Sequence, residues 1–130
     1  GPGDHRLSLI AVADLVECLV LAAEQGERLD EALVWAKRAV ELAPKLPHFY
    51  DTLGWVYRAR KEYDQAIEAL QKATTMEPPR ADIFYHLGVV YAEHGKKDEA
   101  ITALQKALDL DSNFAEVADA RQRLETLKKQ

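Results

Sequence analysis

Asp82 and His86 are the first residues to examine for chemistry, because they are four positions apart and would share one face of a helix. His48 could lie opposite them if the helices that carry these residues pack side by side. Two histidines and a carboxylate could hold a zinc ion. Such a trio on an exposed surface, with no further groups to orient it, more often forms a solvated polar patch. We therefore expect no metal, no cofactor and no catalytic residue here.

The elements that carry these side chains are predicted to be helices. Apolar residues recur at helical spacing through residues 7–23, and Gly26 follows where a helix end would need a left-handed residue. Proline marks further boundaries, with Pro44 ending one helix and Pro47 opening the next. No segment alternates as a strand would. The expected helices, about seven in number, span 7–23, 29–43, 47–60, 63–76, 81–94, 97–110 and 115–128.

An internal repeat of 34 residues organises these helices into pairs. Residues 47–80 and 81–114 share twelve identical positions, among them Leu53 and Leu87. Small residues recur at the same period, with Gly54 and Gly88 on the first helix of each pair. Small side chains are needed where two helix axes approach to about 8–10 Å. The period predicts a stack of similar helix pairs, as in other repeat proteins.

The repeated pattern resembles the tetratricopeptide repeat. Positions that are equivalent in successive repeats are called columns here. The signature columns hold an aromatic residue, then Leu-Gly-x-x-Tyr as in Leu53 to Tyr57, and later Ala66, Leu70, Ala73 and Pro78. The resemblance implies an all-α fold, a right-handed superhelical α-solenoid of antiparallel helix pairs. Three repeats are expected at about 13–46, 47–80 and 81–114, with a capping helix at 115–128 whose polar residues face water. The wording of residues 51–57 is reminiscent of bacterial members of the family.

One catalytic arrangement and two classes of partner are disfavoured by the sequence. Cys18 and His86 lie two repeats apart, about twice the 8–10 Å helix spacing, which is too far for a nucleophilic pair. The formal net charge is −5, and basic residues are interleaved with acidic ones, so no basic stripe suits nucleic acid. No apolar run is long enough to span a membrane. We expect a soluble, non-enzymatic domain, cytoplasmic or periplasmic, over residues 4–130, with residues 1–3 resembling a tag remnant.

In tetratricopeptide arrays the first helix of each pair lines a concave groove, and this resemblance selects the candidate binding residues. The 34-residue period sorts them into columns, one of which is apolar throughout and contains tryptophan, a residue type enriched in binding hot spots. That column suggests an apolar strip along the groove. Alternatively, its outer members tuck against neighbouring helices and Trp55 partly covers the core. The candidate groove residues are Asp14, Glu17, Leu21, His48, Asp51, Trp55, Arg58, Asp82, Tyr85, His86 and Val89.

Two functions remain open from the sequence. The first is recognition of a peptide segment or partner protein that offers an apolar or aromatic anchor, with basic residues toward the acidic end near Asp14 and Glu17 and an acidic group for Arg58 and His48. The basic clamp with which some family members bind a chaperone's terminal carboxylate is absent, because its columns hold acidic and apolar residues. The second is a structural role, in which the array self-associates or acts as a spacer in a longer protein.

Overall fold

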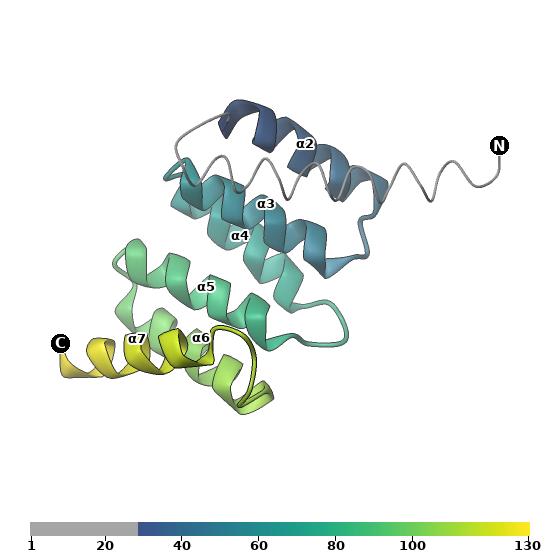
Figure 1. The fold of residues 1–130 in the computed structure, drawn as a ribbon. Coiled ribbons are helices and arrows are strands. Elements are labelled where there is room, and N and C mark those ends of the chain that lie inside the picture. The colour runs from purple at the N-terminus through teal and green to yellow at the C-terminus, as the bar shows by residue number, and fades with distance from the viewer. Residues whose placement is uncertain (1–28) are drawn as a thin grey trace.

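A computed structural model describes residues 29–130, and these form six helices joined by short connections (Figure 1). The predicted helix at 7–23, and with it the first helix of the first expected repeat, lies outside the described residues. The helices fall within two residues of the expected bounds. They are α2 (Leu29–Leu42), α3 (Pro47–Ala59), α4 (Tyr63–Thr74), α5 (Ala81–Glu93), α6 (Lys97–Leu110) and α7 (Val117–Lys129).

Each helix packs against the next one in the chain, and α3 also contacts α5. Figure 1 shows the result as a stack, with α2 at one end and α7 lying over α6 at the other. Contacts between sequential helices and between neighbouring pairs are what a solenoid requires, because each pair can bury its apolar face only against its neighbours. The predicted all-α solenoid of helix pairs is confirmed.

Two equivalent crossings hold the helix pairs together. A Cβ atom on Gly54 of α3 would lie 2.5 Å from Cγ of Leu70 in α4, and one on Gly88 of α5 would lie 2.7 Å from Cγ of Leu104 in α6. Carbon atoms do not approach so closely, so only glycine lets these leucines cover the opposite helix. Both leucines are fully buried. The repeated Leu-Gly-x-x-Tyr segment is therefore a packing feature.

The turn between the two helices of each pair needs a left-handed residue. Lys61 has a φ of 63°, and Gly95, which is 34 residues later, has a φ of 79°. Glycine adopts this conformation without steric cost, whereas lysine does not. The same turn is thus formed in both pairs, with a strained residue in the first.

Candidate functional site

The face formed by α3 and α5 has a hydrogen-bonded pair of a carboxylate and a histidine at its centre. Asp51 on α3 and His86 on α5 are joined by a contact of 2.7 Å between Oδ1 and Nδ1. Only 11% of the Asp51 side chain and 19% of the His86 side chain are exposed. A buried carboxylate needs a hydrogen-bond partner. The partner of Asp51 lies on the next repeat, so this pair links the first helices of two repeats.

The surroundings of His86 favour its charged form. Burial lowers the pKa of His86, but the hydrogen bond to Asp51 and the negative charges of Asp51, Asp82 and Glu116 outweigh it. The pKa of His86 therefore lies above its ordinary value of 6.5. When protonated, His86 neutralises part of the negative charge of these carboxylates.

Trp55 contacts two planar groups on the same face. Its ring is 4.4 Å from the His86 ring, centroid to centroid, and the guanidinium of Arg58 lies 4.2 Å from its centroid. Arg58 in turn donates two hydrogen bonds to Glu93 on α5, of 2.8 and 2.7 Å. The tryptophan is half-buried, with its inner side against the core. A partly exposed aromatic ring is thereby flanked by polar groups.

A second polar cluster joins α5 to α7. The hydroxyl of Tyr85 donates a short hydrogen bond to Asp119, which also accepts one of 2.7 Å from Nε of Arg123. Burial and the bond to Asp119 raise the pKa of Tyr85 to about 12. The same bond, with the charge of Arg123, lowers the pKa of Asp119 below 3.8. These groups fix the last helix onto the face.

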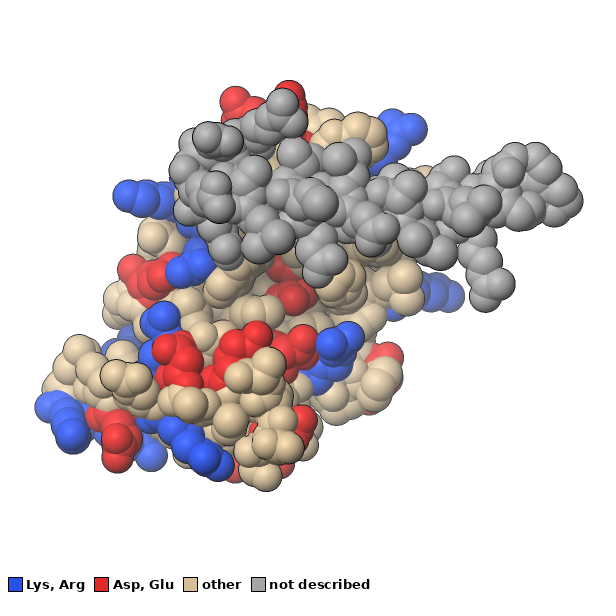
Figure 2. All heavy atoms as spheres, in the orientation of Figure 1, with Lys and Arg blue, Asp and Glu red and all other residues tan. Residues whose placement is uncertain are grey.

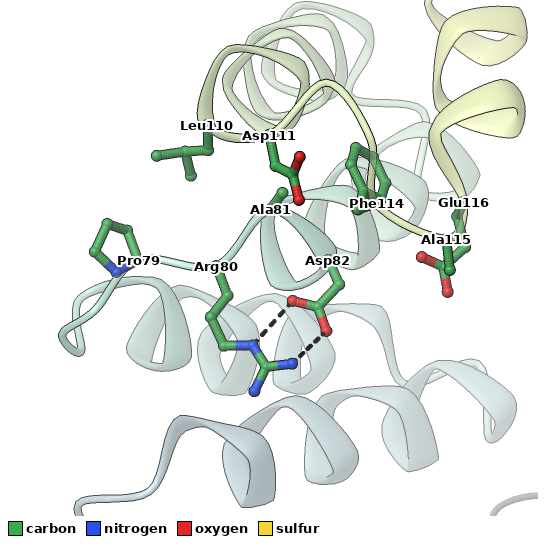
Figure 3. Close-up of a pocket in the computed structure, with 9 residues that line it drawn as sticks. All are labelled: Pro79, Arg80, Ala81, Asp82, Leu110, Asp111, Phe114, Ala115 and Glu116. Atoms are coloured by element: carbon green, nitrogen blue, oxygen red, sulfur yellow. Dashed lines mark hydrogen bonds and ion pairs between the residues drawn. The ribbon is translucent and has the colours of Figure 1, made fainter.

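A pocket of about 530 Å³ lies where α5 and α7 begin and α6 ends (Figure 3). Arg80 binds Asp82 through two contacts of 3.2 and 3.0 Å, shown dashed in Figure 3. Two further carboxylates, of Asp111 and Glu116, lie in the wall away from that guanidinium. The rest of the wall is largely apolar. Figure 2 shows acidic side chains gathered over the part of this face that α5 and α7 form.

The structure places the predicted groove residues in different environments. His48 is exposed at the start of α3, whereas Asp51 and Tyr85 are each only 8% exposed. Asp82, Trp55, Arg58 and His86 are partly exposed. Asp14, Glu17 and Leu21 lie outside the described residues. Six of the predicted groove residues thus lie near one another. They are Asp51, Trp55, Arg58, Asp82, Tyr85 and His86.

Val89 requires a correction. We expected it to continue an apolar strip along the groove, but it is 1% exposed and belongs to the core that α5 shares with α6 and α7. The capping helix covers that position, so the apolar side chain finds its partner inside the protein. Within the described residues of this column, Val89 belongs to the core, and Trp55 packs partly buried against the same cluster.

Sequence reasoning also missed three residues of the capping segment. Glu116, Asp119 and Arg123 were expected to face water as part of a polar cap, but all three are partly buried at the face. The 34-residue repeat period already indicated these three positions. Counting 34 residues on from Asp82, Tyr85 and Val89 leads to Glu116, Asp119 and Arg123, so the columns extend into the cap.

Residues 29–130 lack the features of two other kinds of site. They contain no group of three or more His, Cys, Asp or Glu side chains placed to hold a metal ion. None of their helices is long and apolar enough to cross a membrane.

Comparisons with known proteins agree on one family. The tetratricopeptide repeat profile matches residues 52–113. A TPR protein of Thermus thermophilus is similar in structure, with a TM-score of 0.79 and 26% identity. The match covers 94% of this chain and 64% of the Thermus protein, so the chain spans less than two thirds of that relative. No curated protein matches the chain by sequence.

Two similar structures were solved with peptides. The Yersinia enterocolitica type III secretion chaperone SycD, in complex with a peptide of the translocator YopD, has a TM-score of 0.72 and 20% identity, with 88% of each chain covered. The first TPR of Spaghetti (RPAP3), bound to an HSP90 peptide, has a TM-score of 0.79 and 17% identity, covering 93% of this chain and 90% of that one. At these identities the likeness concerns the fold. The repeat period, the helix crossings and the profile match show that residues 52–113 consist of tetratricopeptide repeats.

Proposed function

We propose that this chain is a protein-interaction module that binds a segment of a partner protein on the face formed by α3, α5 and α7. The observation that carries the proposal is the setting of Trp55, whose half-buried ring contacts His86 and Arg58. A rigid aromatic surface loses little conformational entropy on binding, which is why tryptophan dominates many interfaces. No catalytic role is proposed for any residue.

The surrounding groups suit recognition of a segment that has both an apolar side chain and polar groups. Trp55 offers apolar contact, while His48 and Asp82 present polar groups at the same face. A helix or an extended segment could lie along such a surface. The peptide complexes of SycD and of Spaghetti support this proposal, because the same fold receives a peptide in each.

The test is selection of peptides from a random 12-residue display library on the immobilised protein. We expect the wild-type chain to select peptides, and Trp55→Ala to bind the same peptides at least about tenfold more weakly, as removal of a hot spot does. Val34→Ala is the matched control, because it removes an exposed apolar side chain from α2, outside this face. Circular dichroism must show that both variants are folded at the assay temperature.

Failure of the wild-type chain to select any peptide would contradict the proposal, as would unchanged binding to Trp55→Ala. A second candidate function, self-association, is favoured by the exposed apolar side chains of Val34, Leu42 and Leu46 at the α2 end of the described stack. Light scattering over a concentration series separates the two: self-association raises the average mass with concentration, whereas a recognition module stays monomeric.

A further inference from the structure

We propose that the pocket between α5, α6 and α7 receives a lysine or arginine side chain of the bound segment. The inference rests on the proposed function, since it names the chemistry of one anchor on the partner. It starts from the charges of the pocket wall, which holds three carboxylates and one guanidinium: Asp82, Asp111, Glu116 and Arg80.

The one cation among the described residues of the wall is already engaged. Arg80 makes two contacts to Asp82, and Asp82 also accepts a hydrogen bond of 3.0 Å from the backbone N–H of Ile83 in the first turn of α5. Asp82 is therefore compensated by a guanidinium and by the positive end of a helix. Asp111 and Glu116 have no ion pair within residues 29–130.

Glu116 is the pocket carboxylate that most needs a hydrogen-bond donor. Its Oε2 atom is buried from solvent and has no hydrogen-bond partner within the described part of the chain. A buried carboxylate oxygen without a donor costs free energy. A donor from a ligand would recover that free energy once the partly exposed Glu116 side chain turns this oxygen toward the pocket. Asp111 adds a second carboxylate at the C-terminal end of α6, where the helix dipole is also negative.

The shape of the pocket selects among cationic groups. Pro79, Ala81, Leu110, Phe114 and Ala115 supply an apolar wall next to the carboxylates. Lysine and arginine have this same division, with an apolar stem and a charged end. The volume of about 530 Å³ is enough for such a side chain together with its neighbouring backbone. The described residues offer no cluster suited to a metal ion instead.

The pocket adjoins the proposed binding face at Asp82, which lies in the pocket wall and one helical turn before His86 on α5. The charges of Asp82 and Glu116 act on His86, which contacts Trp55. A segment with an apolar residue over Trp55 could thus place a basic side chain among these carboxylates. An acidic side chain at the same place would be repelled, so the pocket also sets specificity.

The experiment repeats the random 12-residue selection on the wild type, on Glu116→Gln and on Glu125→Gln. Glutamine keeps the size of glutamate and removes its charge, and Glu125 is an exposed residue of α7 outside the pocket wall. We expect wild-type and Glu125→Gln selections to be enriched in lysine and arginine at one peptide position, and Glu116→Gln to lose that enrichment. A synthetic peptide with the selected basic residue should bind Glu116→Gln about tenfold or more weakly, as loss of a charged hydrogen bond predicts.

The outcomes separate this inference from the proposed function. Peptides selected through Trp55 but with no preference for basic residues would overturn the pocket assignment and leave the binding face intact. Equal binding of the basic peptide to wild type and Glu116→Gln would also overturn it. If the wild-type chain selects no peptide at all, both proposals fail together.

Discussion

The helix pairs α3–α4 and α5–α6 share one helix crossing but differ in the chemistry of their exposed faces. At the crossings, Gly54 meets Leu70 in the same way that Gly88 meets Leu104. On the faces, Asp51 pairs with a histidine, whereas Tyr85, 34 residues later, pairs with Asp119 of the capping helix. The residues that repeat every 34 positions thus specify how the helices pack. The residues that differ between repeats form the polar contacts between repeats and would contact a partner protein.

The largest effect is expected at the glycine crossings. Gly54→Ala and Gly88→Ala each place a Cβ within 2.7 Å of a buried leucine, and we expect each to lower the free energy of unfolding by about 1–3 kcal/mol, as overpacking does. Urea unfolding followed by circular dichroism measures it. The two losses should be similar because the crossings are equivalent.

A double-mutant cycle sharpens that prediction. Leu104→Ala removes the atoms that the new Cβ would strike, so Gly88→Ala should cost less in that background than in the wild type. If the losses in unfolding free energy simply add, the new Cβ atom does not act through Leu104. The equivalence of the two helix pairs would then not depend on this contact.

The second effect concerns pH and tests the polar face. Because the folded-state pKa of His86 is raised, its contribution to stability is fully present below the unfolded pKa of about 6.5 and is lost as pH rises through the folded pKa. Asp51→Asn should lower the pKa of His86, measured by NMR titration of its imidazole. It should also reduce the stability difference between pH 6 and pH 8. An unchanged titration would show that Asp51 does not hold the imidazolium.

The smallest effect compares the two left-handed turn residues. Lys61→Gly relieves a strained backbone at the position where the next pair already has Gly95, and we expect a gain of up to about 1 kcal/mol. Thermal unfolding measures it as a small rise in midpoint. Gly95→Lys is the matched reverse change and should destabilise by a similar amount. A loss of stability in Lys61→Gly would show that the lysine side chain contributes more than the turn costs.

The sequence by itself determined the fold because packing is local and repeated. Apolar spacing, proline and glycine placed all six described helices to within two residues, and the 34-residue period identified Gly54 and Gly88 as crossing residues. Such features depend on near neighbours in the chain and on one adjacent repeat, so they can be read from the pattern.

Tertiary structure alone decided which free columns are exposed and which groups are paired. Val89 looked like part of a groove but is covered by α7, and Glu116 looked like a solvated cap residue but has a buried carboxylate oxygen. The cause is the capping helix, which closes the last repeat without carrying the repeat's own signature. Its position depends on contacts from Tyr85 to Asp119 across 34 residues, and side-chain burial of that kind follows from the packed geometry of several helices at once.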